Sequence, residues 1–559
     1  MNKIFRNGLM MLATGALAVS CADYNETTGF TAEPDPTYVE PYNDLDPVKS
    51  YINKEKYPNM SLGATLKVAD FNKQELAHAA AITNFNNVTF GSTLMSGAII
   101  SEKGIMNFLS MIDLLNHVQE IGGEVYGSAI AANANQADKW LEYLTSPIEI
   151  PVDPIDDADI DYTKMEEWHG TQISGKNAAK IVKNYDGSDN ALMVPKSSQV
   201  YIAEGFDIDL QGKYTVTFYT KVEKDATITC TFSDSTMMEN AKDKKKYQLK
   251  AGNWQKIVLE SLSPKEDATT GYFMIGGNKN ADVYIKAVKI FHEPDNHRPQ
   301  TDQERNDTIH YALNTWCETL MKYNEGRIKS FDLIEEAIDT KSTLGNGMYD
   351  LKHAGKNQIF WQDILGSENY APVVSDIASA AFTKYGGNPA DLKFFISESG
   401  LEEAKKFESL EYWIGVWENK GAQIDGINAK LNIFYSEDAA TQEATETTLN
   451  TLLDNLAKTG KLIRLSNFDF KYQDAEGSYV TADKITAEQR QKLADFYGHA
   501  LKLYMSKIPN EKQAGICKTN MVDTSNGSGD PVGLWTISST KDWVRTATYK
   551  AFCDARSGK

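Results

Sequence analysis

Two short segments of the chain carry the polar side chains best suited to chemistry. Residues 331–338 read Phe-Asp-Leu-Ile-Glu-Glu-Ala-Ile, and residues 464–470 read Arg-Leu-Ser-Asn-Phe-Asp-Phe. The first contributes the carboxylate of Glu336, which can exchange a proton or attack a substrate. The second contributes the amide of Asn467, which cannot replace a nucleophilic carboxylate. A reaction that needs a carboxylate at each of these two positions would therefore find only one, that of Glu336.

The elements around these segments predict a barrel of the α/β class. Strands at 60–67, 87–92 and 124–130 alternate with helices at 74–84 and 105–121, and five more strands are expected at 328–335, 392–397, 424–433, 461–467 and 514–519. Three strands plus five give eight, the number in a (β/α)8 TIM barrel. Glu336 and Asn467 then follow the fourth and seventh strands, at the end of the barrel where active sites lie.

A β-rich segment interrupts this alternation after the third strand. Short strands with turn signals about every ten residues predict an antiparallel β-sandwich, inserted at 153–295. Alternation along residues 214–222 assigns Tyr214, Val216 and Phe218 to the core face and Tyr219 to the exposed face. Trp254 and Tyr272 open strands and are expected to be core anchors.

The amino terminus predicts export. Lys3 and Arg6 precede a short apolar run that ends in Ala-Val-Ser before Cys21, so residues 1–20 are expected to be a signal peptide. The small residues before Cys21 resemble a bacterial lipobox, which implies lipidation of Cys21. The acidic residues that follow resemble the surface-export signal of Bacteroidetes lipoproteins. A lipid-anchored, surface-exposed protein of the outer membrane is expected, with a flexible stalk at 21–46 and barrel halves at 47–152 and 296–559.

Composition narrows the range of partners. The chain has 57 Lys and Arg against 77 Asp and Glu, a net charge of −20. This balance argues against nucleic acid or an anionic membrane surface as a partner, so the membrane is expected to be reached only through the lipid anchor. Four further cysteines show no metal-binding spacing and are expected to be buried free thiols: Cys230, Cys317, Cys517 and Cys553. Neither a metal nor a cofactor is predicted.

The two polar segments resemble the site of xylanases of glycoside hydrolase family 10. Residues 331–338 resemble the family's Trp-Asp-Val-Val-Asn-Glu-Ala-Ile stretch, and residues 464–470 resemble its Ile-Thr-Glu-Leu-Asp stretch. The resemblance places Glu336 at the general acid and Asn467 at the nucleophile. Other sugar-handling positions of the family are replaced here by Ser92, Thr93, Met95, Ser128, Ala132, Asn133, Ser397, Glu398, Ser399, Lys430, Asn432 and Thr519. A retaining glycosidase needs two carboxylates about 5 Å apart, so the resemblance implies a barrel that has lost its chemistry.

The inserted segment is similar to carbohydrate-binding modules of families 4 and 9, which implies sugar binding through exposed aromatic rings. A sugar's apolar face stacks on such a ring while its hydroxyls meet polar groups. The candidate ligand-binding rings are Trp168, Tyr201 and Tyr219 in the insertion, and Trp140 and Trp535 after the third and eighth barrel strands.

The sequence leaves three functions open. The first is a surface lipoprotein that captures polysaccharide, with xylan or a related plant glycan as the default ligand, beside components of an outer-membrane glycan importer. The second is an active glycoside hydrolase, either endo-1,4-β-xylanase-like or substrate-assisted, with rearranged residues. Glu336 and Glu398 would form an inverting pair if they stood about 6.5–9.5 Å apart. The third is a purely structural subunit of an uptake complex.

Overall fold

The structure is a computed structural model that describes residues 42–557, except 74, 234, 237–246, 356–357, 525–528 and 539–541. The predicted signal peptide, Cys21 and most of the predicted stalk lie outside the described residues. The chain divides into two compact units, one formed by Met1–Thr145 with Asp302–Lys559 and the other by Ser146–Thr301. Within the described part, no helix is both long and apolar enough to span a membrane.

The first unit is a closed barrel of eight parallel strands. In order around the barrel these are β1 (Leu62–Thr65), β2 (Asn87–Thr89), β3 (Glu124–Gly127), β19 (Ser330–Glu335), β22 (Lys393–Ser399), β23 (Gly426–Lys430), β25 (Leu462–Ser466) and β27 (Gln513–Lys518). β27 pairs with β1, which closes the ring. The predicted barrel class and its three-plus-five strand division are confirmed.

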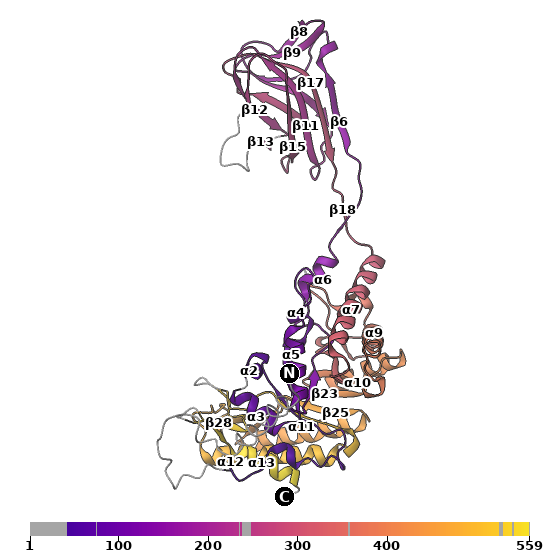
Figure 1. The fold of residues 1–559 in the computed structure, drawn as a ribbon, viewed down its shortest axis with the longest axis vertical. Coiled ribbons are helices and arrows are strands. Elements are labelled where there is room, and N and C mark those ends of the chain that lie inside the picture. Colours follow the sequence, from indigo (N-terminus) through magenta and orange to yellow (C-terminus); the bar gives the residue numbers. More distant parts are fainter. Residues whose placement is uncertain are drawn as a thin grey trace, which may run out of the picture. The chain divides into compact units, whose positions relative to one another are not determined.

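Helices connect the strands and lie outside them (Figure 1). They are α2 (Val68–Asn72), α3 (Leu76–Asn84), α4 (Ser96–Ile99), α5 (Leu109–Glu120), α6 (Asp138–Leu144), α7 (Asp302–Asn324), α8 (Trp361–Leu365), α9 (Tyr370–Lys384), α10 (Ala404–Asn419), α11 (Ala439–Lys458), α12 (Ala487–Lys507) and α13 (Ala547–Ser557). The longest, α7, buries Ile309, Leu313 and Trp316 at helical spacing against the barrel. The Trp316 indole also donates to the carbonyl of Ile130, over 3.0 Å.

Short pairs of strands lie in the loops of this unit. They are β20 (Ile338–Thr343) with β21 (Tyr349–Leu351), β24 (Phe434–Ser436) with β26 (Lys471–Gln473), and β28 (Trp535–Ile537) with β29 (Trp543–Arg545), while β4 (Ala131–Ala132) extends the barrel sheet beside β19. The four cysteines within the described residues are buried and free, as the sequence predicts.

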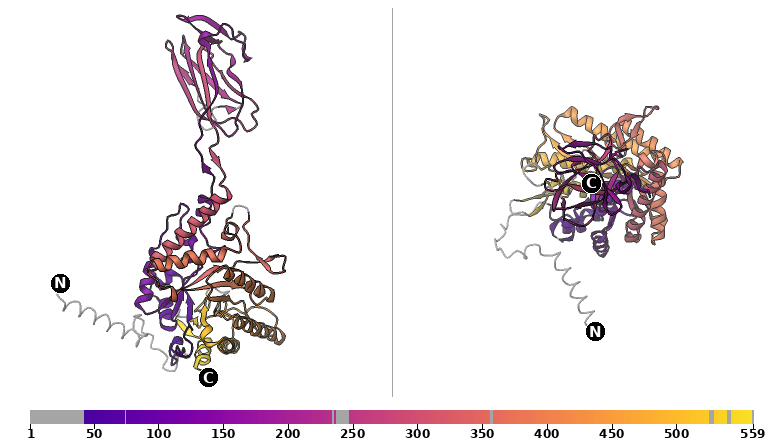
Figure 2. Two further views of the ribbon diagram at one scale, coloured as in Figure 1. Left: turned by 90° about the vertical axis from the view of Figure 1, so that its right-hand side faces the viewer. Right: turned by 90° about the horizontal axis from the view of Figure 1, so that it is seen from above.

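The second unit is an antiparallel β-sandwich between α6 and α7, which confirms an insertion after the third barrel strand (Figure 2). One sheet holds β8 (Lys180–Asp186), β9 (Asp189–Val194), β17 (Val283–Glu293), β11 (Lys213–Val222) and β15 (Gln255–Leu262), with β6 (Ile155–Asp161) also paired to β17. The other holds β7 (Gln172–Ser174), β10 (Gln199–Phe206), β16 (Gly271–Gly276), β12 (Ala226–Phe232) and β13 (Ser235–Thr236), with β14 (Tyr247–Leu249) on β12. A small pair, β5 (Ile148–Glu149) with β18 (His297–Arg298), completes the unit, whose bounds are wider than the expected 153–295.

The facing inner surfaces of the two sheets form the sandwich core. Tyr214, Val216 and Phe218 are fully buried and Tyr219 is 38% exposed, so the predicted alternation along β11 is confirmed. The prediction that Trp254 and Tyr272 anchor the core is wrong. Both rings are half-buried on outer faces. Tyr272 alternates with the inward-facing Phe273 on β16, and Trp254 stands immediately before β15, outside the strand.

Candidate functional site

A cavity of about 270 Å³ opens at the carboxyl ends of the barrel strands. About half of its lining residues stand at or just beyond a strand end: Thr65, Thr89, Gly127, Glu335, Lys430, Ser466, Asn467, Cys517 and Thr519. Parallel strands deliver these side chains to one edge of the barrel although they are far apart in the sequence. This is the part of a (β/α)8 barrel that carries active sites.

Glu336 stands just past β19 and is held as a carboxylate. The Ser399 hydroxyl donates to its Oε2 over 2.9 Å, and Lys430 Nζ lies 3.5 Å from its Oε1. Burial pushes the pKa of Glu336 upward, but the ammonium charge of Lys430 and the Ser399 hydrogen bond outweigh it, so the pKa is lowered. A general acid needs the opposite shift, because it must hold its proton at working pH.

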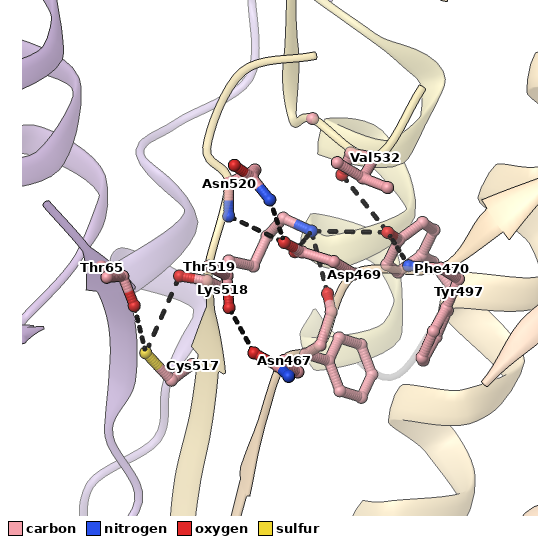
Figure 3. A network of polar contacts seen from close by, with 12 residues as sticks. Thr65, Asn467, Asp469, Phe470, Tyr497, Cys517, Lys518, Thr519, Asn520 and Val532 are labelled. Atoms are coloured by element: carbon pink, nitrogen blue, oxygen red, sulfur yellow. Dashed lines mark hydrogen bonds and ion pairs between the residues drawn. The ribbon is translucent and has the colours of Figure 1, made fainter. Parts of the chain in front are cut away.

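Asn467 stands just past β25, and Figure 3 shows how its amide is fixed. The Thr519 hydroxyl donates to Asn467 Oδ1 over 2.7 Å. Beside it, the buried Lys518 ammonium contacts Asp469 Oδ1 at 2.7 Å and the carbonyl of Phe468 at 2.9 Å. Asp469, the carboxylate in this segment, therefore forms a buried ion pair with Lys518.

Glu336 and Asn467 share an unusual backbone conformation. Their φ angles are +52° and +50°, in the left-handed region that costs a non-glycine residue about 1 kcal/mol or more. Such strain occurs preferentially at functional sites. The strain lies mainly at Glu336, because asparagine adopts the left-handed region more readily than most non-glycine residues.

Glu398, the possible partner of Glu336 in an inverting pair, is completely buried. It accepts a hydrogen bond from the Ala337 amide at 3.0 Å and forms a 2.8 Å ion pair with Lys406. Burial raises its pKa to about 7, against the opposing charge of Lys406. Protein groups therefore enclose both oxygens of Glu398, whereas the base of an inverting pair must hold a water molecule.

The sequence did not predict a buried polar network that lies beneath the cavity. Asp332 accepts hydrogen bonds from the Tyr126 hydroxyl at 2.6 Å and from the Asn428 amide at 3.1 Å. Burial raises the pKa of Asp332 to about 6. The Arg464 guanidinium lies 3.9 Å from the centre of the Tyr126 ring. The signal available in the sequence was a charged residue inside each of two apolar strands, Phe-Asp-Leu-Ile and Leu-Ile-Arg-Leu.

The replaced family positions divide into four groups. Ser92, Met95, Ser128, Lys430 and Thr519 line the cavity. Ala132, Ser397 and Glu398 are buried, Asn133 and Ser399 are half-buried, and Thr93 and Asn432 are exposed to solvent. The cavity therefore presents mostly hydroxyl and amide groups, with one ammonium group paired to Glu335 and Glu336.

The five candidate aromatic rings divide between the two units, with Trp140 and Trp535 in the barrel unit and Trp168, Tyr201 and Tyr219 in the sandwich. Trp140 and Trp535 are 4% and 6% exposed and pack in the barrel unit's core, which gives no support to their predicted role in ligand binding. Trp168 is half-buried against the sandwich core. Tyr201 and Tyr219 lie on different sheets of the sandwich, on β10 and β11.

Tyr201 instead pairs with Tyr272 on the neighbouring strand. The two rings stack with their centroids 4.4 Å apart and an angle of 24° between them. Met274 lies opposite Tyr201 across the strand pair and points to the same outer face. These three side chains form a half-buried aromatic surface on one sheet, called the Tyr201–Tyr272 platform below.

Comparisons with known proteins agree with this architecture. The family model for glycosyl hydrolase family 10 matches residues 291–548, the second part of the barrel together with the end of the insertion. A search of curated proteins gives no match.

Several solved xylanases share the fold. Penicillium canescens endo-1,4-beta-xylanase XylE aligns with a TM-score of 0.50 and 12% identity, over 92% of this chain and 98% of that chain. Xylanase 10C of Cellvibrio japonicus aligns with a TM-score of 0.51 and 11% identity, over 94% and 75% of the two chains. An endoxylanase from a sugarcane soil metagenome gives 0.50 and 9%, over 92% and 100%. Together with the closed eight-stranded barrel, these findings show that the chain has the (β/α)8 fold of glycosyl hydrolase family 10.

Proposed function

We propose that this protein is a cell-surface lipoprotein that binds polysaccharide and whose xylanase-like barrel is catalytically silent. It would capture glycan chains for uptake beside an outer-membrane importer, with xylan as the default ligand because the solved neighbours are xylanases. Cys21 would carry the lipid anchor.

Two features support a catalytically silent barrel: the nucleophile position holds the amide of Asn467, and the acid position holds an ionised carboxylate, Glu336. Asn467 cannot form a glycosyl ester, and Lys430 lowers the pKa of the one motif carboxylate, Glu336. Both components of retaining hydrolysis are therefore compromised at the positions where the fold would place them.

Polysaccharide binding is supported by the Tyr201–Tyr272 platform. Two stacked rings and a methionine offer an apolar surface on an outer sheet face, which suits the apolar face of a sugar ring. Substituting Tyr201→Ala or Tyr272→Ala should weaken binding of xylohexaose by roughly tenfold, which corresponds to about 1.4 kcal/mol.

One observation favours the rival function, an active glycoside hydrolase. Asp332 lines the cavity and has a pKa of about 6, a value that suits a proton donor better than that of Glu336. Hydrogen bonds from Tyr126 and Asn428 occupy this carboxylate, and it is 7% exposed.

The decisive experiment measures binding and turnover on one preparation of the full chain. Calorimetry with xylohexaose and reducing-sugar release from xylan, mannan and β-glucan should give binding without release. Release that disappears in Asp332→Asn or Glu336→Gln would establish the hydrolase instead. Absence of both binding and release would leave the structural-subunit function in its place.

A further inference from the structure

The sandwich has a second aromatic surface, on the sheet that does not carry the Tyr201–Tyr272 platform. A cavity of about 480 Å³ lies there, lined by Asp161, Thr163, Asp189, Tyr219, Trp254, Lys286 and Ala287. Its residues come from β6, β9, β11 and β17, and from the residues next to β6 and β15. The cavity is large enough to receive at least one sugar ring.

The small side chain of Ala287 leaves the space for this cavity. Tyr219 lies opposite Ala287 across β11 and β17, and Ala287 lies opposite Asp161 across β17 and β6. The three side chains therefore form a row across three adjacent strands, with the smallest in the middle. A larger residue at this position would fill the space between the Tyr219 ring and the Asp161 carboxylate.

Trp254 forms a wall whose orientation is fixed by polar contacts. Its indole nitrogen donates to Asp186 Oδ2 over 2.6 Å, and the Tyr185 ring meets it edge-on with centroids 6.2 Å apart. The ammonium groups of Lys221 and Lys286 lie 5.9 and 5.8 Å from the Trp254 ring centroid. A half-exposed tryptophan held by this many neighbours loses little conformational entropy when it binds a ligand.

The charges around Trp254 indicate which glycans fit. Lys286 is paired with Asp189 at 3.1 Å, and Lys221 with Asp186 at 4.0 Å. Asp161 is a third carboxylate, held by the backbone amide and hydroxyl of Thr163 at 2.9 and 2.5 Å. Both ammonium groups therefore already have carboxylate partners, and acidic groups outnumber basic ones.

We propose that this cavity is a second, independent binding site of the sandwich, for a neutral polysaccharide chain. Trp254 and Tyr219 would contact the apolar face of a sugar, while Asp161 and Lys286 exchange hydrogen bonds with its hydroxyls. A uronate-rich chain would add negative charge beside the three carboxylates and be repelled. The proposal rests on the polysaccharide-binding function above but uses none of the residues of the Tyr201–Tyr272 platform.

The test uses calorimetry on the full chain with xylohexaose, cellohexaose and mannohexaose as neutral probes and hexagalacturonate as the acidic one. At least one neutral probe should bind at two sites per chain, and the acidic probe should bind at least tenfold more weakly. Trp254→Ala, Tyr219→Ala and Ala287→Leu should each remove one site and leave the other. Ala287→Leu removes no polar group, so it tests occupancy of the cavity. Tyr311→Ala, which removes an exposed tyrosine of the barrel unit, should change neither site.

The outcomes separate this proposal from the function it assumes. A single site that is lost in Tyr272→Ala and unchanged in Trp254→Ala and Ala287→Leu would overturn the second site and uphold the first. A single site that is lost in Trp254→Ala and Ala287→Leu but unchanged in Tyr272→Ala would uphold the cavity and overturn the platform. Absence of binding to every probe would overturn both. Tighter binding of hexagalacturonate at the Trp254 site would overturn its assignment to neutral glycans. Thermal unfolding of each variant checks that its sandwich is folded.

Discussion

Lys430 Nζ lies 3.5 Å from Glu336 Oε1 and also forms an ion pair with Glu335, so one ammonium group faces two adjacent carboxylates. All three side chains are mostly buried at the end of the barrel, where water screens the charges less than at the surface. The charge of Lys430, with the Ser399 hydrogen bond, keeps Glu336 ionised in spite of burial. Among the groups that lower the pKa of Glu336 against burial, Lys430 therefore has the largest effect.

We predict that Lys430→Met raises the pKa of Glu336. Removing the ammonium group leaves burial opposed mainly by the Ser399 hydroxyl, and burial favours the neutral carboxyl. The measurement is a 13C titration of labelled glutamate, with Glu336→Gln to assign the resonance. Lys103→Met, at an exposed lysine, is the control and should leave the titration unchanged. An unaltered Glu336 pKa in Lys430→Met would contradict the role given to this ion pair.

A second prediction concerns pH and the stability of the barrel unit. The folded-state pKa of Glu398 is about 7, above the value of about 4.3 in an unfolded chain. Between these values the folded state binds more protons than the unfolded state, so this group's contribution to stability falls as pH rises from about 4 to about 7 and is constant above that. The shift sets an upper limit of roughly 4 kcal/mol on the loss.

Urea unfolding at pH 5 and pH 8 tests this sign. The free energy of unfolding of the wild type, relative to Glu398→Gln, should be lower at pH 8 than at pH 5. Glu408→Gln, at an exposed position of α10, serves as the matched control and should show no such difference. A relative stability of the wild type that rises with pH would refute the assignment.

The third prediction is the lipid anchor. Cys21→Ser should move the protein from the membrane fraction to the soluble fraction, because acylation needs the thiol and acyl chains on one cysteine can tether a globular domain. Ser20→Ala, which keeps a small residue before Cys21, should stay in the membrane fraction. Membrane association of Cys21→Ser that survives a high-salt wash would disprove the anchor.

Much of the fold could be predicted because it depends on local patterns. Alternation along β11 identified Tyr214, Val216 and Phe218 as core and Tyr219 as exposed, and the strand count identified the barrel. Trp254 was misassigned because it stands immediately before β15, where alternation no longer fixes which face a side chain takes.

The cavity network could not be predicted because its contacts join distant parts of the chain. Tyr126 and Asp332 are 206 residues apart, and Asp332 and Asn428 are 96 apart. Strand register decides which of these side chains meet, and register depends on the closed barrel as a whole. A resemblance located Glu336 and Asn467 at strand ends, but the contacts with Lys430, Ser399 and Thr519 required the structure.

The last prediction is that Asn467→Glu alone does not create a xylanase. The Thr519 hydroxyl could donate to the new carboxylate as it now donates to the amide, so a nucleophile would be present. The acid would still be missing, because Lys430 and Ser399 keep Glu336 ionised and a leaving group needs a proton. Reducing-sugar release from xylan should therefore stay at background in an overnight assay at high protein concentration, with an active family 10 xylanase as the positive control. Release by Asn467→Glu that vanishes when Glu336→Gln is added would show that Glu336 can act as the acid, and that the amide at position 467 alone silences the barrel.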